Sequence, residues 1–276
     1  MISETFSVSP TNSEAILTSY LWEPSLQQSP DNRWQPELRP AVIICPGGAY
    51  VFLSDREAEP VAMQFYAKGL QVFVLRYSIL EESRYPNPLE EASRAIWLVR
   101  SHAKEWGIDE QKIIFGGFSA GGHLTSLIGT RWNEPGLAER LRIPVEGNKP
   151  NGLILCYAKF EPIDETLIDL VTPEQLGHML RVYDQRADGI KNVSSFTPPS
   201  FIWHTVQDET VPVDESLRFA LKCQQEQVPF ELHAYAEGEH GLSLSNDLSD
   251  YRKYHPVNVE GWVTLCVNWF KHILDF

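Results

Sequence analysis

Short apolar runs alternate with amphipathic stretches along most of the chain. The runs are rich in β-branched and aromatic residues, a composition typical of strands that a sheet buries on both faces. They predict strands at residues 15–24, 41–45, 71–77, 112–117, 152–158, 200–205 and 230–235. Because helical stretches separate most of these runs, the pattern predicts a mostly parallel sheet.

Between the runs, apolar residues recur at three- and four-residue steps, which is the spacing of a helix with one buried face. The segment 88–106 shows the clearest repeat. The expected helices are residues 56–68, 88–106, 120–130, 213–226 and a final helix that carries Trp262, Leu265, Cys266, Trp269 and Ile273. With helices on both faces of the sheet, residues 1–276 are expected to form a single α/β domain.

The alternation breaks between Arg131 and Pro199, where prolines and charged residues are frequent. We interpret residues 159–198 as an excursion over the top of the sheet. A small lid and an ordinary surface helix and loop explain this segment equally well. An earlier polar stretch that contains prolines, Ser25–Pro40, predicts a loop.

The formal net charge is −14, and lysine and arginine form no cluster. This balance argues against nucleic acids and anionic membrane surfaces as partners. No apolar run reaches the length of about eighteen residues that spans a bilayer, and residues 1–10 lack the basic and apolar regions of a signal peptide. The four cysteines form no C-x-x-C pair. We therefore expect buried, reduced thiols and a cytoplasmic protein, rather than disulfides or a metal site.

One serine stands among glycines, between a predicted strand and a predicted helix. The sequence Gly117-Phe118-Ser119-Ala120-Gly121 fits the G-x-S-x-G pattern of a nucleophile on a sharp strand-to-helix turn. Glycines remove side chains that would clash across such a bend, and the start of the helix directs main-chain N–H groups toward negative charge. A glycine-rich turn with an incidental serine is the alternative. The position between strand and helix favours a nucleophilic serine.

A serine hydroxyl needs a base, and two later loops supply candidates. In the fold that this motif predicts, an acid and then a histidine follow the serine along the chain, each after a later strand. Asp208 follows the strand at 200–205, and His240 follows the strand at 230–235. We therefore expect Ser119 to attack a carbonyl carbon, His240 to transfer the proton, and Asp208 to orient the imidazole.

The loop Pro46–Tyr50, with the sequence PGGAY, follows the predicted strand at 41–45. Small residues in this position let main-chain N–H groups approach an oxyanion closely. We expect donors from Gly48 or Ala49, joined by the N–H of Ala120. A plain turn built on Pro-Gly is the alternative.

Other polar and aromatic residues have plainer explanations. We interpret the remaining histidines as structural: His102, His123, His178, His204, His233 and His255. Glu209 is expected to point away from the site, and Asp214 to cap a helix. Tyr50, Phe118 and Trp203 supply aromatic surface to a substrate pocket or pack in the core, and the sequence supports both.

With these motifs, the chain resembles α/β-hydrolase-fold esterases, and more narrowly those related to acetyl xylan esterases and the hormone-sensitive-lipase-like carboxylesterases. The likeness extends from about Ala41 to Phe276 and rests on CPGGAY, FVLRYS, IIFGGFSAGGHL, TPPSFIWHTVQDETVPVDES and ELHAYAEGEHGLSL. It implies hydrolysis of short-chain acyl esters, often acetyl esters of sugars, without a metal or cofactor. The chain has Pro46 and Ala49 where many relatives have a histidine and a third glycine.

Three functions fit these observations. The leading hypothesis is a cofactor-independent serine carboxylesterase that acts on a small-molecule ester. A serine peptidase of the same fold is the second, although such peptidases often carry a large additional domain for which 276 residues leave no room. A binding module without catalysis is the third, although all three triad positions are filled. The sequence leaves open whether the chain forms a homo-oligomer.

Overall fold

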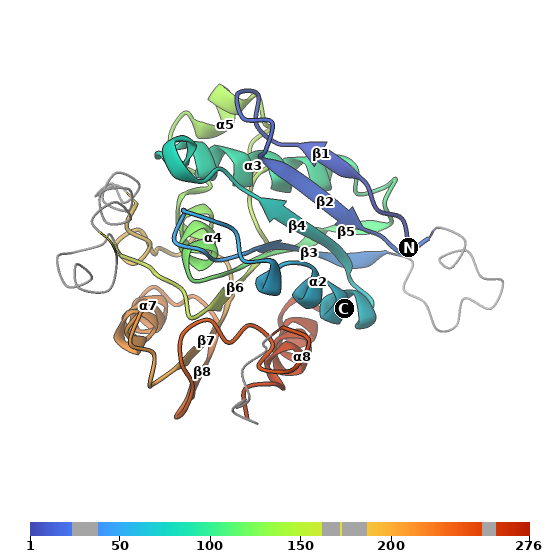
Figure 1. Cartoon of the computed structure of the whole chain (residues 1–276). Coiled ribbons are helices and arrows are strands. Elements are labelled where there is room, and N and C mark those ends of the chain that lie inside the picture. Colours follow the sequence, from blue (N-terminus) through green and yellow to red (C-terminus); the bar gives the residue numbers. More distant parts are fainter. Residues whose placement is uncertain (24–37, 162–171, 173–186, 250–257) are drawn as a thin grey trace.

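Among the residues that the structure describes, eight strands form one sheet in the order β1-β2-β4-β3-β5-β6-β7-β8 (Figure 1). The structure is a computed structural model, and it describes residues 1–23, 38–161, 172, 187–249 and 258–276. The strands from β3 to β8 run parallel, whereas β1 and β2 pair antiparallel at one edge. The strands are β1 (Thr5–Ser7), β2 (Ile16–Tyr20), β3 (Arg39–Cys45), β4 (Gln71–Arg76), β5 (Ile108–Phe118), β6 (Gly152–Cys156), β7 (Ser200–Thr205) and β8 (Phe230–Tyr235).

The strand order reverses at β3. The chain passes from β3 to β4 on one side and then to β5 on the other, and Val42 of β3 lies opposite Val72 and Ile114 in the two neighbours. Open α/β sheets bind their ligands at such a reversal, beyond the carboxyl ends of the strands. The loop after β3 and the turn after β5 flank this point, and they carry the predicted oxyanion donors and Ser119.

Helices cover both faces of the sheet (Figure 1). Successive side chains of a strand point to opposite faces, so that Ile43 packs in the core with α3, α4 and α7, and Ile44 packs in the core with α2 and α8. This double covering explains why β3 is buried throughout. The helices are η2 (Asp55–Glu57), α2 (Glu59–Ala67), η3 (Leu80–Ser83), α3 (Asn87–Ser101), α4 (Ala120–Arg131), α5 (Leu137–Leu141), α7 (Val213–Gln225) and α8 (Trp262–Leu274).

The structure confirms the mostly parallel sheet and the helices on both faces, with shifted ends. The strand β1 is only three residues long and carries too little pattern to be predicted. The helix expected to reach residue 106 ends at Ser101, because the chain turns there and the N–H of Ile108 donates back to the carbonyl of Ala103. The helix expected from residue 56 is split, since the 3-10 turn η2 precedes α2.

Two expected segments fall mainly outside the described residues. The loop Ser25–Pro40 coincides largely with residues 24–37, and the excursion 159–198 includes residues 162–171 and 173–186. All four cysteines are buried and unpaired, as expected. None of the helices in the described ranges is long and apolar enough to cross a bilayer.

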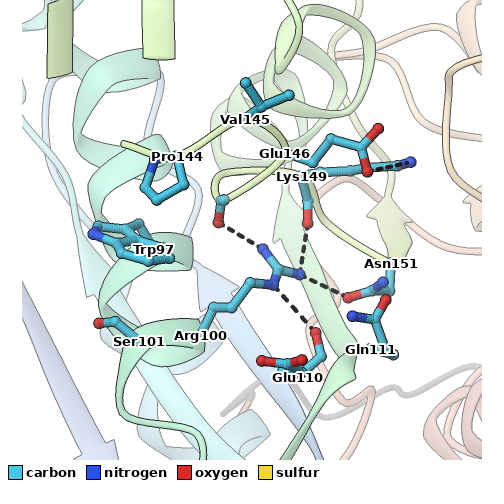
Figure 2. A pocket seen from close by; sticks show the side chains of 11 residues that line it. Trp97, Arg100, Ser101, Glu110, Gln111, Pro144, Val145, Glu146, Lys149 and Asn151 are labelled. Carbon is cyan, nitrogen blue, oxygen red and sulfur yellow. Dashed lines mark hydrogen bonds and ion pairs between the residues drawn. The ribbon is translucent and has the colours of Figure 1, made fainter. Parts of the chain in front are cut away.

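Arg100 of α3 ties this helix to the segments that precede β6 (Figure 2). Its guanidinium group donates to the carbonyl oxygens of Gly147 at 2.6 Å, Lys149 at 2.8 Å and Glu110 at 3.2 Å, and to Oδ1 of Asn151 at 2.9 Å. These residues border a hollow of about 460 Å³. The hollow lies near the amino end of β5, where Glu110 borders it, and the eight residue steps from Glu110 to Phe118, at about 3.3 Å each, place it about 26 Å from the opposite end of the strand. We therefore interpret Arg100 as an anchor of the fold.

Replacing Arg100 by methionine removes the donors and keeps most of the aliphatic side chain. We expect the free energy of unfolding to fall by about 2–4 kcal/mol, because three carbonyl groups and an amide oxygen lose hydrogen bonds from one charged group. Urea denaturation measures this change. Arg84→Met is the control, since the Arg84 side chain is 60% exposed in its ion pair with Glu81 and should contribute little. Equal midpoints for the two variants would contradict the anchoring role.

Candidate active site

Ser119 occupies the sharp turn between β5 and α4. Its φ of 50° and ψ of −113° are unusual for a residue with a side chain, as the motif predicts for a strained turn. A Cβ atom on Gly117 would lie 2.2 Å from the carbonyl oxygen of Gly121, so the bend excludes side chains on its flanks. The glycines thus allow the tight turn that projects Ser119 beyond the sheet.

The turn also lies against the end of β3. A Cβ atom on Gly121 would be 2.2 Å from the carbonyl oxygen of Cys45, and one on Gly47 would be 2.9 Å from the carbonyl oxygen of Phe118. Real atoms do not approach this closely, so both positions require glycine. The close approach brings the loop Pro46–Tyr50 beside Ser119.

His240 connects the serine to an acid. Its Nε2 lies 2.9 Å from Oγ of Ser119, and its Nδ1 lies 2.7 Å from Oδ2 of Asp208. Asp208 follows β7 and His240 follows β8, so neighbouring parallel strands deliver both side chains to the same edge of the sheet. The structure therefore brings the three residues predicted from the sequence into one chain of hydrogen bonds.

The partners of the ring fix its tautomer. The Asp208 carboxylate only accepts hydrogen bonds when ionised, so Nδ1 of His240 carries a proton and donates it. The neutral ring then has a lone pair on Nε2, which accepts the hydroxyl proton of Ser119. His240 remains partly exposed, with 19% of its side chain accessible, whereas the Asp208 side chain is fully buried.

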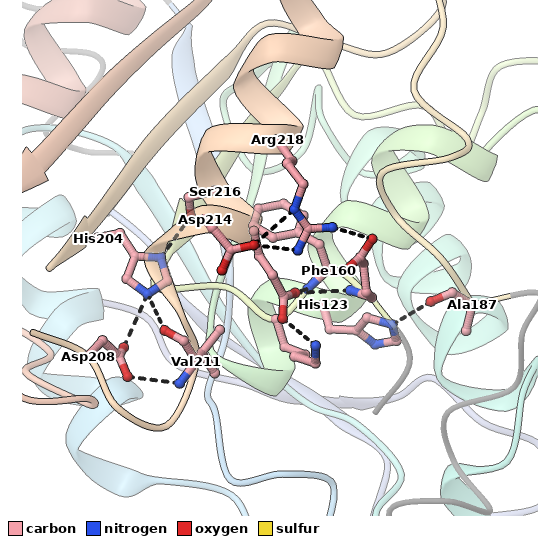
Figure 3. A network of polar contacts seen from close by, with 12 residues as sticks. His123, Phe160, Ala187, His204, Asp208, Val211, Asp214, Ser216 and Arg218 are labelled. Carbon is pink, nitrogen blue, oxygen red and sulfur yellow. Dashed lines mark hydrogen bonds and ion pairs between the residues drawn. The ribbon is translucent and has the colours of Figure 1, made fainter. Parts of the chain in front are cut away.

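Asp208 is surrounded by donors. Its Oδ1 accepts the N–H groups of Thr210 and Val211, both at 2.9 Å, and its Oδ2 faces His204 as well as His240. Figure 3 shows the contacts with Val211 and His204. Burial by itself would raise the pKa of this carboxyl group. The hydrogen bonds from the two histidines outweigh burial and hold the pKa of Asp208 well below its usual range.

His204 is a second partner of this acid that the sequence did not reveal. Its Nε2 lies 3.2 Å from Oδ2 of Asp208 and 2.9 Å from the carbonyl oxygen of Val211, so this nitrogen carries a proton. Its Nδ1 lies 2.8 Å from Oγ of Ser216 in α7 (Figure 3). We interpreted a histidine inside a strand as structural. His204 lies near the carboxyl end of β7, four residues before Asp208. This position is the sequence feature that could have indicated contact between His204 and Asp208.

The loop after β3 has the geometry of a tight main-chain turn. Gly48 has a φ of 128°, Ala49 of 54° and Tyr50 of 58°. The N–H groups of Val51 and Phe52 both donate to the carbonyl oxygen of Gly48. A Cβ atom on Gly48 would lie 2.1 Å from the carbonyl oxygen of Phe52, so this turn also needs glycine.

The amides expected to bind an oxyanion remain available. Within the described ranges, the N–H groups of Gly48, Ala49 and Ala120 have no protein acceptor. Gly48 and Ala49 are half-buried, while Ala120 begins α4 directly after Ser119. Amides in these positions can donate to a ligand without breaking a hydrogen bond of the fold.

The three aromatic residues weighed for substrate contact are buried, and core packing is one of the two roles that the sequence supports for them. Phe118 is 1% exposed and packs against Tyr157 and Trp262, and Trp203 is fully buried. A side chain at the end of a doubly covered strand points into the core when its neighbour in sequence points into the site. Their role is to pack the region below Ser119.

Tyr50 is buried too, and its hydroxyl donates to Nδ1 of His123 at 2.9 Å. Nε2 of His123 donates to the carbonyl oxygen of Ala187 at 2.8 Å (Figure 3). Burial lowers the pKa of His123 to about 4, so the ring is neutral near pH 7. Tyr50 therefore supports the loop from within, and it also borders a small pocket together with Tyr85 and Leu127.

The described ends of the expected excursion are fastened beside the site. The N–H of Lys159 donates to the carbonyl oxygen of Ser119, and its ammonium group pairs with Glu215 of α7. Glu215 also accepts the N–H of Phe160 at 2.7 Å (Figure 3). The carbonyl of Phe160 accepts the N–H of Gly189. Both ends of the segment thus meet between α4 and α7.

An open hollow of about 650 Å³ adjoins the histidine. The residues that line it are Val206, Gln207, Asp208, Glu209, Thr210, Glu239 and His240. Glu209 and Glu239 are exposed, so the rim of the hollow is acidic. Among the described residues, no group of three His, Cys, Asp or Glu side chains is placed to hold a metal ion.

Comparisons with known proteins agree with this geometry. Residues 28–223 match the BD-FAE family. The chain is 32% identical over 225 residues to the endo-1,4-beta-xylanase B of Butyrivibrio fibrisolvens, which covers 76% of this chain and 33% of that protein. The chain spans about half or less of the length of the curated relatives that it matches.

Two solved structures align over nearly the whole chain. A carboxylesterase from Lactobacillus plantarum aligns with a TM-score of 0.84 at 26% identity, over 99% of this chain and 98% of that chain. An acetyl ester-xyloside bifunctional hydrolase from Caldicellulosiruptor lactoaceticus aligns with a TM-score of 0.74 at 32% identity, over 96% and 90%. These likenesses confirm the α/β-hydrolase fold and the resemblance to carboxylesterases. The chain belongs to the BD-FAE family of α/β-hydrolase-fold proteins.

Proposed function

We propose that this chain is a serine carboxylic-ester hydrolase that acts on short-chain acyl esters, foremost acetyl esters, and that its substrates include acetylated carbohydrates. One observation carries the proposal: Ser119, His240 and Asp208 form an unbroken chain of hydrogen bonds of 2.9 and 2.7 Å. A hydroxyl linked to an imidazole that a carboxylate orients is the arrangement that makes serine nucleophilic at neutral pH.

The reaction begins when Oγ of Ser119 bonds to the carbonyl carbon of the ester, while its proton passes to Nε2 of His240. The carbonyl oxygen takes up the negative charge, and the N–H groups of Ala49 and Ala120, with that of Gly48, stabilise it. His240 then gives its proton to the leaving alkoxide as the carbon–oxygen bond breaks. Water, deprotonated by the same nitrogen, attacks the acyl-enzyme, releases the carboxylic acid and restores the serine.

Asp208 acts through the histidine. It keeps the proton on Nδ1, so that Nε2 is free to accept the proton of Ser119, and it then stabilises the imidazolium ion. The low pKa of Asp208 keeps the carboxylate charged throughout this cycle. Hydrogen bonds from His204 and from two main-chain amides hold the Asp208 carboxylate in position.

The surroundings of the site disfavour anionic substrates and are compatible with a neutral, polar one. Glu209 and Glu239 border the hollow beside His240, and the whole chain carries a net charge of −14. This field repels anionic esters and leaves neutral ones unaffected. An acetylated sugar is neutral and offers hydroxyl groups to the polar lining. The similar protein from Caldicellulosiruptor lactoaceticus is an acetyl ester-xyloside bifunctional hydrolase, and this likeness supports the substrate class.

Replacing Ser119 by alanine removes the nucleophile. We expect kcat/KM for p-nitrophenyl acetate to fall by about 10⁴-fold or more, with an unchanged circular dichroism spectrum. Ser101→Ala is the matched control, because this exposed serine lies at the end of α3 and its contacts, with the carbonyl of Leu98 and the ring of His102, are local. Undiminished activity in the Ser119 variant would overturn the proposal.

The acyl and alcohol preferences are tested by steady-state hydrolysis of p-nitrophenyl esters from acetate to octanoate, alongside acetylated xylose and an aminoacyl amide. We expect the highest kcat/KM for the acetate among the p-nitrophenyl esters, and turnover of the acetylated sugar. The highest kcat/KM at a longer acyl chain would contradict the acetyl preference and indicate a general carboxylesterase. Cleavage of the amide without the esters would favour the peptidase.

The low pKa of Asp208 predicts a pH-dependent stability. The unfolded carboxyl group titrates near its ordinary pKa of about 4, and the native one titrates lower. The charged carboxylate therefore stabilises the native state above about pH 4, and this contribution is lost as the pH falls further. Urea denaturation of wild type and Asp208→Asn should show a gap in unfolding free energy that is constant near neutrality and shrinks below about pH 4.

Asp214→Asn is the control for this measurement. Its carboxylate is 59% exposed in an ion pair with Arg218, so its removal should change the stability little at any pH. A gap between wild type and Asp208→Asn that does not change with pH would contradict the assigned ionisation.

A further inference from the structure

A buried carboxylate joins two loops of the proposed site. Glu57, at the end of η2, is 3% exposed. Its Oε2 accepts the main-chain N–H of Gly47 at 2.8 Å, and its Oε1 accepts the hydroxyl proton of Tyr157 at 2.6 Å. The oxygen of Tyr157 in turn accepts the N–H of Ser243 at 2.9 Å. Four groups thus form a continuous link from the loop after β3 to the loop after β8.

One end of this link lies against the nucleophile. Gly47 directly precedes Gly48 in the oxyanion loop, and its carbonyl oxygen accepts the N–H of Ser54. A Cβ atom on Gly47 would lie 2.8 Å from Oε2 of Glu57 and 3.1 Å from Cβ of Ser119. The glycine is therefore wedged between the carboxylate and the serine. A shift of Glu57 would move the amides that follow Gly47.

The other end lies against the histidine. The ring of Tyr157 meets the ring of His240 edge to face, with centroids 5.1 Å apart. Ser243 follows His240 by three residues, and its Oγ donates to the carbonyl oxygen of Arg56 at 2.7 Å. The η2 turn therefore holds the histidine loop at two points, through Tyr157 and directly.

The donors and acceptors of these hydrogen bonds can pair in only one way. Glu57 receives an N–H on one oxygen and an O–H on the other, and a carboxylate suits two donors. Tyr157 is buried, and burial together with the charge of Glu57 holds the pKa of its hydroxyl well above its usual range, so it stays protonated. A glutamine at position 57 would turn its NH₂ group toward one of two donors and break one bond.

We propose that Glu57 and Tyr157 are positioning residues, which hold the oxyanion loop and the His240 loop at a fixed separation. This inference rests on the proposed function. It concerns transition-state geometry, because the amides of Gly48 and Ala49 must meet an oxyanion while His240 meets the hydroxyl of the serine. Displacements of about 1 Å in such arrangements reduce rates by about 10²-fold.

The test uses Glu57→Gln, Tyr157→Phe and the double variant, with p-nitrophenyl acetate as the substrate. Reaction with a fluorophosphonate titrates the active sites, so that kcat refers to folded enzyme only. We expect each single variant to lose about 10- to 100-fold in kcat per titrated site, with KM changed by less than about threefold. Because the pair acts as one link, the double variant should be about as slow as the slower single variant.

Two matched controls separate positioning from general loss of buried polar contacts. Glu91→Gln alters another buried carboxylate that accepts a main-chain N–H and a hydroxyl, both from Ser78. Tyr85→Phe removes another tyrosine hydroxyl that donates to a carboxylate, that of Glu134 at 2.7 Å. Both controls should keep kcat per titrated site within about threefold of wild type.

The outcomes distinguish this inference from the proposed function. An active wild type with unchanged kcat in Glu57→Gln and Tyr157→Phe would overturn the positioning role alone. Losses that multiply in the double variant would overturn the single link between the two residues. A wild type that turns over no ester would overturn the proposed function and the positioning role together.

Discussion

The close approach of two stretches of main chain is the constraint on which the rest of the site depends. The first turn of α4 lies so near the end of β3 that a side-chain carbon on Gly121 would be 2.2 Å from the carbonyl oxygen of Cys45. This contact places Ser119, whose φ is 50°, beside the loop Pro46–Tyr50. Such a backbone conformation costs about 1–3 kcal/mol, which the doubly buried strands β3 and β5 offset through their packing.

A layer of buried polar groups lies at the carboxyl edge of the sheet. Asp208 receives hydrogen bonds from His204, from His240 and from two main-chain amides, and Glu57 receives them from Gly47 and Tyr157. Buried carboxylates are tolerated only when donors satisfy them in this way. Because the loops after β3, β6, β7 and β8 share these two acids, the parts of the site are mutually constrained.

The fold and the reacting residues were accessible from the sequence because each has a local signature. The G-x-S-x-G turn has a strand before it and a helix after it, and the order of acid and histidine along the chain follows from the topology. His204 and Glu57 have no such signature, since the sequence places one inside a predicted strand and the other at the start of a predicted helix. Their roles arise from contacts between distant segments. The sequence leaves open whether Phe118 lines a pocket or packs in the core. Its phenyl ring is buried in the core, while its neighbour Ser119 faces the site.

The central claim is that one serine performs the chemistry. The most direct measurement is to react the protein with a fluorophosphonate, locate the adduct by peptide mass spectrometry, and follow hydrolysis of p-nitrophenyl acetate in the same sample. The account predicts one adduct per chain, on the peptide that contains Ser119, with ester hydrolysis lost in proportion to labelling. An adduct elsewhere, or full hydrolysis by completely labelled protein, would contradict it.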